Sequence, residues 1–209
     1  MFEGTKTSIK LYPCCRYTHG SIDATLDIVQ KNDITPDDVV EVVSHVAQHA
    51  CDVVGKPFEI RESPQVDAQF SIPYTVSVAI ARRSVFIDDF FEDKIKGDSQ
   101  VLQLAKKVRV VVDQEPIAKG LTPCVVDIRT KDDKVYSERV EILRGDPRKP
   151  VTMEEVALKF QRCTAFFTKP MSQKNIDSVY VMVRNLETVP DISELVRVLD
   201  EWKEGNGNS

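Results

Sequence analysis

"PCVVDIRTKDDKVYSERVEI", residues 123–142, decides the fold class of this chain. On both sides of its centre, apolar and polar residues alternate at a period of two, which is typical of β-strands with one buried face. The polar KDDK between the two runs indicates the turn of a hairpin. Similar patterns predict two more strands, at 38–48 and 108–115. We therefore expect a small mixed or antiparallel sheet.

Helical periodicity surrounds these strands. Ile22, Leu26 and Val29 fall on one face of a helix predicted over 20–31. Further helices are predicted over 66–83, 85–93 and 98–108. Pro73 lies near the start of the first of these, where a helix tolerates proline. Residues 1–150 are thus predicted to form an α+β domain, a small sheet with flanking helices.

The last part of the chain is predicted to be helical. Thr152 and Glu155 form a capping-box pattern at the start of a helix that runs to about residue 167. Two more helices are expected over 172–187 and 191–203, followed by a disordered tail at 204–209. The apolar faces of 151–203 exceed what the small sheet domain can cover, so these helices pack either on one another or on a helical body outside this chain.

Composition excludes several classes of function. The chain has 209 residues, 42% of them hydrophobic, and a net charge of −5 without a basic stripe, so nucleic acid is not an expected partner. No apolar run approaches the roughly 18 residues of a membrane span. The N-terminus lacks the apolar segment of a signal peptide, so we expect a cytoplasmic protein without a membrane partner. Five irregularly spaced cysteines indicate reduced thiols.

The segment KLYPCCRYTH (10–19) gathers residues that are capable of chemistry. One alternative is a zinc site made by Cys14, Cys15, His19, His45, His49 and Cys51, but no zinc-like spacing recurs among them. Another is a thiol nucleophile, Cys14 or Cys15 with His19, but no oriented base or oxyanion site accompanies it. The cysteines are better interpreted as packing under the loop, and no metal is expected.

The same segment also carries a cluster of cations. Lys10, Arg16 and His19 lie on a loop that leads into the helix start near Ser21, an arrangement that suits a carboxylate ligand. The alternative is that Lys10 and Arg16 are solvated surface charges and that His19 is a partner of the helix N-terminus. A second loop, 144–150, offers Arg144, Arg148 and Lys149 with the same two readings.

Four motifs, taken together, resemble a known family. In chain order they are KLYPCCRYTHGSIDA (10–24), VDAQFSIPYTVSVA (66–79), VDIRTKDDKVYS (126–137) and RGDPRKPVTMEEVALKF (144–160). Their order is similar to that of the MmgE/PrpD family, which includes 2-methylcitrate dehydratase, cis-aconitate decarboxylase and iminodisuccinate epimerase. The resemblance covers most of this chain but only the C-terminal half of the family's usual length.

The resemblance implies cofactor-independent chemistry on a small di- or tricarboxylic acid. A base moves a proton next to a carboxylate, cations hold the carboxylates, and water or CO2 is lost or a stereocentre is inverted. Lys10 and His19 are the implied catalytic residues, although His19 could instead bind a carboxylate or serve the structure. Lys10, Arg16 and Arg148 are the expected substrate-binding residues. Cys15 stands where cis-aconitate decarboxylase has a histidine, and Gln69 where many relatives carry a cation.

The resemblance also implies an incomplete active site. The family's remaining acid and base residues belong to a large helical half that precedes the lid-like α+β domain, and the final helices return to pack on that half. Met1 lies nine residues before Lys10, at the expected domain junction. We expect a partner chain with the helical half, or a homo-oligomer, and no activity from this chain alone. The rival hypothesis is a noncatalytic module for anion binding or protein interaction.

Overall fold

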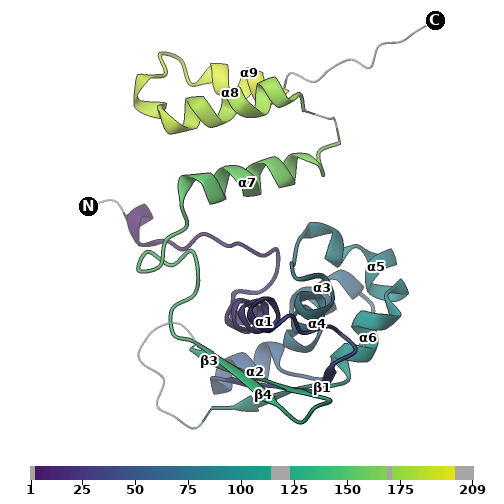
Figure 1. Ribbon diagram of the computed structural model, residues 1–209. Coiled ribbons are helices and arrows are strands. Elements are labelled where there is room, and N and C mark those ends of the chain that lie inside the picture. The colour runs from purple at the N-terminus through teal and green to yellow at the C-terminus, as the bar shows by residue number, and fades with distance from the viewer. Residues whose placement is uncertain (1–2, 114–122, 169–170, 201–209) are drawn as a thin grey trace, which may run out of the picture. The chain divides into compact units, whose positions relative to one another are not determined.

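The computed structural model of this protein describes residues 3–113, 123–168 and 171–200, which form two compact units, 1–150 and 151–209 (Figure 1). Unit 1 combines helices with a four-stranded sheet, so the α+β prediction is confirmed. Unit 2 is helical in its described residues. No helix in the described ranges is long and apolar enough to cross a membrane.

The sheet of unit 1 is mixed. Its strands, in spatial order, are β2 (Val108–Val112), β1 (Val39–Val46), β3 (Cys124–Thr130) and β4 (Val135–Val140). The pair β1 and β2 is parallel, whereas β3 runs antiparallel to both β1 and β4. All four predicted strands and the KDDK hairpin are thereby confirmed. Residues 114 and 115 of the predicted strand at 108–115 lie outside the described residues.

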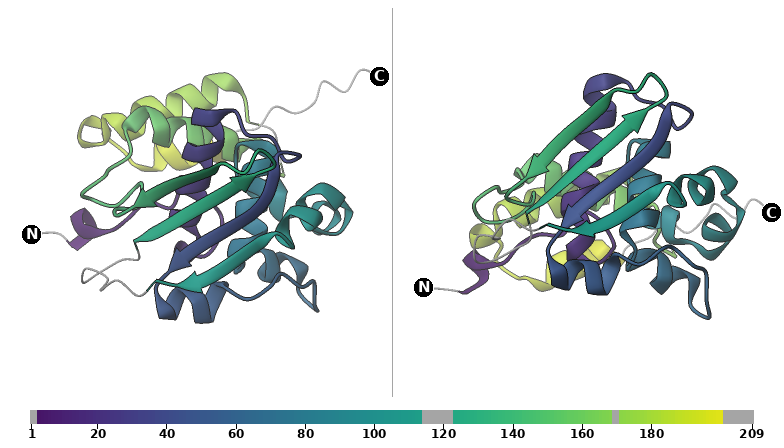
Figure 2. Two further views of the ribbon diagram at one scale, coloured as in Figure 1. Left: turned by 60° about the horizontal axis from the view of Figure 1, so that its bottom comes forward. Right: turned by 90° about the horizontal axis from the view of Figure 1, so that it is seen from below.

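Helices cover one face of this sheet (Figure 2). The two main ones are α1 (His19–Asn32), which contacts β3 and β4, and α4 (Ile72–Arg82), which contacts α1 and β2. Val42, Val126 and Ile128 point from the sheet into the core beneath them. Gly20 lets the start of α1 approach β3 closely, because a Cβ atom there would lie 2.8 Å from the Cys124 sulfur. The N-terminal end of α1 is therefore held against the sheet.

Two sequence-based boundaries are wrong. The helix predicted over 66–83 is broken into α3 (Pro64–Gln69) and α4, because Pro73 has no N–H and Ser71 starts a new helix by accepting from Tyr74 N at 3.1 Å. The predicted strand 38–48 ends at Val46, and α2 (Gln48–Val54) follows it, so His49 lies on a helix.

The remaining segments of unit 1 are short. They are η1 (Glu3–Lys6), η2 (Arg16–Thr18), η3 (Ile87–Phe90), α5 (Glu92–Gly97) and α6 (Ser99–Ala105). The helix predicted over 85–93 is thus a 3-10 turn followed by α5. Asp98 caps α6 by accepting from Val101 N at 3.0 Å.

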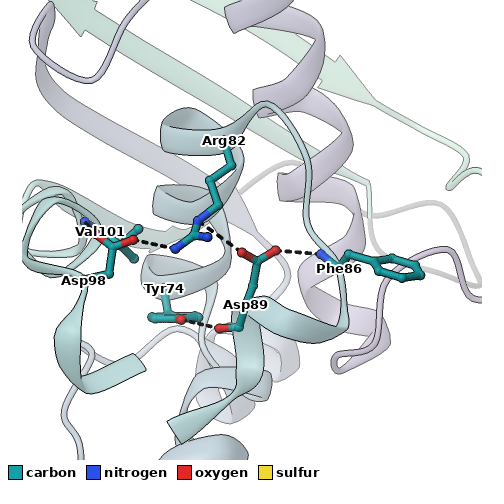
Figure 3. A network of polar contacts seen from close by, with 6 residues as sticks. All are labelled: Tyr74, Arg82, Phe86, Asp89, Asp98 and Val101. Atoms are coloured by element: carbon teal, nitrogen blue, oxygen red, sulfur yellow. Dashed lines mark hydrogen bonds and ion pairs between the residues drawn. The ribbon is translucent and has the colours of Figure 1, made fainter. Parts of the chain in front are cut away.

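A buried polar network fastens these short segments to α4 (Figure 3). The Asp89 carboxylate accepts from Phe86 N at 2.7 Å and lies 3.1 Å from Arg82 Nε, and Arg82 Nη2 reaches Asp98 at 2.5 Å. The Tyr74 hydroxyl donates to the Asp89 carbonyl oxygen at 2.5 Å. Since Asp89 is almost fully buried, these partners offset the cost of removing its charge from water.

The described residues of unit 2 form three helices and one 3-10 turn. They are α7 (Met153–Thr164), α8 (Gln173–Arg184), η4 (Leu186–Thr188) and α9 (Ser193–Asp200). The predicted capping box is confirmed, because Glu155 N donates to Thr152 Oγ1 and Thr152 N to the Glu155 carboxylate. In this unit, α8 packs against α9. The predicted tail at 204–209 lies outside the described residues.

Candidate active-site surface

The segment that carries Lys10 is shaped by the turn that precedes α1. Thr18 donates to the Cys15 carbonyl oxygen from both its amide (3.0 Å) and its hydroxyl (2.9 Å), and its hydroxyl lies 3.0 Å from the Cys14 sulfur. Burial raises the pKa of the Cys14 thiol to about 12, so little nucleophilic thiolate forms there near neutral pH. The turn leaves Lys10 exposed and anchors its amino group, which donates to the Cys14 carbonyl oxygen at 3.2 Å.

The two cationic loops expected from the sequence lie side by side (Figure 1). The Ile9 amide donates to the Gly145 carbonyl oxygen at 2.9 Å. Arg16 Nη1 and Nη2 both donate to the Arg144 carbonyl oxygen, each at 3.3 Å. The approach is so close that a Cβ atom on Gly145, whose φ is +80°, would lie 2.2 Å from the Ile9 carbonyl oxygen. Segments that are 128 residues apart in the sequence thus form one surface.

Two buried carboxylates lie under this surface. Asp23 accepts from the Tyr12 hydroxyl at 2.6 Å and from Arg144 N at 3.4 Å, and burial raises the pKa of its carboxyl. Asp146 accepts from Arg148 Nε at 2.9 Å and Nη2 at 3.2 Å, and this contact lowers the pKa of Asp146. Arg148, expected to bind substrate, is therefore exposed but already paired with a carboxylate of its own loop.

The structure buries His19, the second residue expected to be catalytic. Its side chain is in the core, at 1% exposure, and its ring meets that of Tyr12 edge to face with centroids 5.1 Å apart. Its Nδ1 atom lies 3.2 Å from Arg16 Nη1. His19 is thus adjacent to the cationic surface but beneath it, whereas Lys10 is on it.

Gln69 has a role that sequence reasoning missed. Its side-chain amide donates to the Pro13 carbonyl oxygen at 2.9 Å, and its backbone carbonyl oxygen accepts from Cys15 N at 2.9 Å. These two bonds connect the end of α3 to the loop that carries Lys10. The sequence marked Gln69 only as a missing cation, and no local pattern identifies its contact with a loop more than 50 residues away.

The residues considered as zinc ligands have other partners. His45 Nε2 lies 3.0 Å from an Asp127 carboxylate oxygen across the sheet, and the exposed His49 packs edge-on against Tyr17. Within the described ranges, no three His, Cys, Asp or Glu side chains are placed to hold a metal ion together.

Comparison with known proteins identifies a family model that spans parts of both units. Residues 12–185 match the family model for the MmgE/PrpD C-terminal domain. The chain is 26% identical over 205 residues to cis-aconitate decarboxylase from Mus musculus, which covers 95% of this chain and 40% of that protein. Its identity to the Homo sapiens protein of the same name is 24% over 205 residues, 95% of this chain and 41% of the relative.

A third relative, cis-aconitate decarboxylase from Aspergillus terreus, is 24% identical over 201 residues, 92% of this chain and 40% of the relative. The chain therefore spans about two-fifths of the length of the curated relatives that it matches. Since the family model covers most of the chain, including Arg16, His19 and loop 144–150 but beginning two residues after Lys10, this protein belongs to the MmgE/PrpD family and carries its C-terminal domain.

Proposed function

We propose that this chain is the C-terminal, lid-like part of a cofactor-independent lyase or isomerase that acts on a small di- or tricarboxylic acid, similar to 2-methylcitrate dehydratase. The observation that carries the proposal is the junction of the two cationic loops through Ile9, Gly145, Arg16 and Arg144. It supports a surface on which cations from both loops bind carboxylates of one ligand.

Charge supports a polycarboxylate as the ligand. The two loops carry the cations Lys10, Arg16, Arg144, Arg148 and Lys149, whereas the whole chain has a net charge of −5. Their local acids, Asp23 and Asp146, are buried, so the exposed charge of the surface is positive. Charge-assisted hydrogen bonds from lysine and arginine are the strongest contacts that a protein offers to a carboxylate.

The proposed chemistry assigns Lys10 as this domain's acid or base. A proton leaves a carbon next to a carboxylate, and the negative charge that develops on the carboxylate oxygens is stabilised by the cations around it. Loss of water, loss of CO2 or return of the proton to the other face would then complete the reaction. The relatives are named as decarboxylases, but Cys15 replaces the histidine expected of them, so the assay must distinguish the three outcomes.

The proposal further requires a helical N-terminal half. The described part of unit 2 buries only Ile176 and Val179 among its large apolar side chains, whereas Leu158, Val181 and Val196 are more than half exposed. Such faces are typical of helices that pack on another apolar surface. We propose that this surface is the family's helical half, supplied by a longer polypeptide or a partner chain. The alternative is a homo-oligomer, in which a second copy of this chain covers these faces.

The experiment is coexpression of the chain with a helical half from the same organism or from a relative. Dehydration, decarboxylation and epimerisation of citrate-like acids are assayed with and without that half. We expect activity only from the combination, and its loss in Lys10→Ala but not in the control Lys6→Ala, which removes an exposed lysine paired with Glu3 outside the loops. Activity unchanged by Lys10→Ala would refute the role of Lys10. Citrate binding without any turnover would favour the noncatalytic anion-binding module.

A further inference from the structure

The contact between Arg16 and His19 determines the state of the imidazole ring. Arg16 Nη1 lies 3.2 Å from His19 Nδ1. Burial lowers the pKa of Arg16, yet a guanidinium stays protonated in proteins and can only donate hydrogen bonds. His19 Nδ1 must therefore be the acceptor, which makes the imidazole neutral and places its proton on Nε2.

The surroundings of His19 keep Nδ1 as the acceptor of the hydrogen bond from Arg16. The ring is almost fully buried and rests against Tyr12, whose hydroxyl is held by Asp23. A general base must present a free lone pair to substrate, but the lone pair of Nδ1 is already directed at Arg16. If Nδ1 took up a proton, its N–H would point at the N–H of Arg16 Nη1, and the hydrogen bond would be lost.

The other end of Arg16 reaches the second loop. Its Nη1 and Nη2 atoms hold the Arg144 carbonyl oxygen, while Asp23 accepts from the Arg144 amide on the opposite side of the same residue. The backbone of Arg144 is thus held at its N–H and at its C=O. Arg16 contacts His19 directly, and Asp23 is connected to it through Tyr12, whose hydroxyl donates to Asp23 and whose ring lies against the imidazole.

We infer that His19 is a positioning residue and not the base: its neutral Nδ1 orients Arg16, and Arg16 fixes the spacing between the Lys10 loop and loop 144–149. The consequence for ligand binding rests on the proposed function, since this spacing would select carboxylic acids by the separation of their carboxylates. The geometric part of the inference does not depend on that function.

Substitutions that place a hydrogen-bond acceptor at different positions distinguish a positioning role of His19 from a role as the base. In His19→Asn the amide oxygen can take the place of Nδ1 and accept from Arg16, although asparagine cannot act as a base. In His19→Gln the amide reaches the level of Nε2, and His19→Phe keeps the ring against Tyr12 without any acceptor. His49→Phe is the matched control, because that histidine also packs edge-on against a tyrosine but is exposed.

Two readouts on the full chain are needed, with citrate as the probe. We expect His19→Phe and His19→Gln to bind citrate about tenfold more weakly, the factor that corresponds to about 1.4 kcal/mol and to one hydrogen bond of a charged group. Faster amide exchange at Ile9 and Gly145 should accompany this loss, because both amides bond across or within the second loop. His19→Asn and His49→Phe should behave like the unsubstituted chain in both measurements.

The inference would be overturned if His19→Asn lost as much citrate affinity and as much protection from amide exchange as His19→Phe. If the His19 variants do not fold, nitrogen NMR of the unsubstituted chain still decides, because an imidazole proton on Nδ1 would contradict it. If the unsubstituted chain binds citrate neither alone nor together with a coexpressed helical half, the proposed function fails, whereas amide exchange and the tautomer still test the inference.

Discussion

Gly145→Ala should separate the two cationic loops. Gly145 has a φ of +80°, and its carbonyl oxygen accepts from the Ile9 amide at 2.9 Å. A Cβ atom at this position would lie 2.2 Å from the Ile9 carbonyl oxygen, about 1 Å short of an ordinary carbon–oxygen contact. The obstacle is backbone and not the flexible end of a side chain, so the segment next to Lys10 must move.

The expected cost has two parts. Holding a non-glycine residue in the left-handed region costs about 1–2 kcal/mol. Displacing Ile9 breaks its hydrogen bond to Gly145, which contributes about 1 kcal/mol more. We therefore expect Gly145→Ala to lower the free energy of unfolding by about 2–3 kcal/mol and to weaken citrate binding through the displaced Lys10 loop.

Denaturant unfolding and citrate titration of the same samples measure both effects. Gly97→Ala is the control, because its φ is not positive and a Cβ atom there would meet no heavy atom within 4 Å. It should change the free energy of unfolding by less than about 0.5 kcal/mol. If Gly145→Ala were as stable as this control and kept its citrate affinity, the close approach of the two loops would be refuted.

Asp89→Asn should lower the free energy of unfolding by about 2 kcal/mol, because it weakens the buried network of Figure 3, while Asp88→Asn should have little effect; equal denaturation midpoints would contradict this. The pKa of Asp146 lies below its ordinary 3.8 in the folded chain. The ionised Asp146 therefore stabilises the folded chain fully above pH 3.8, and this contribution is lost as the pH falls from there through the lower pKa of the folded chain. Asp146→Asn should lower stability at neutral pH and flatten this acid limb, as circular dichroism would show. Burial raises the pKa of Cys14 and Cys124 to about 12; neither should react with iodoacetamide at pH 8 until the chain unfolds, and mass spectrometry of labelled peptides checks this.

The two errors in element boundaries have different causes. In α2, Ala50 and Val54 are buried four residues apart, a helical spacing that the β-branched run before it obscured. In the broken helix, the apolar surface continues across the break, and the start of the new helix is marked by Pro73 and by the cap on Ser71. Local sequence thus identified the type of most elements, but a run shared by two elements could not be divided by periodicity alone.

The candidate site was predictable only in part. The sequence identified both cationic loops, Lys10 among them, because charge and residue type are visible in the chain. It could not show that Arg148 is paired with Asp146 or that His19 lies beneath the surface, since burial depends on what packs from elsewhere. The roles of Gln69 and Gly145 depend on contacts with residues more than 50 positions away.

The sequence by itself therefore determined the α+β class, the hairpin, the caps and the family, because alternation, turn residues and ordered motifs are properties of neighbouring residues. Only the tertiary structure decided that two loops 128 residues apart form one surface and that Arg16, which His19 orients, connects them. The physical reason is that a hydrogen bond between distant segments depends on how the sheet and α1 bring their ends together, and no local pattern records that distance.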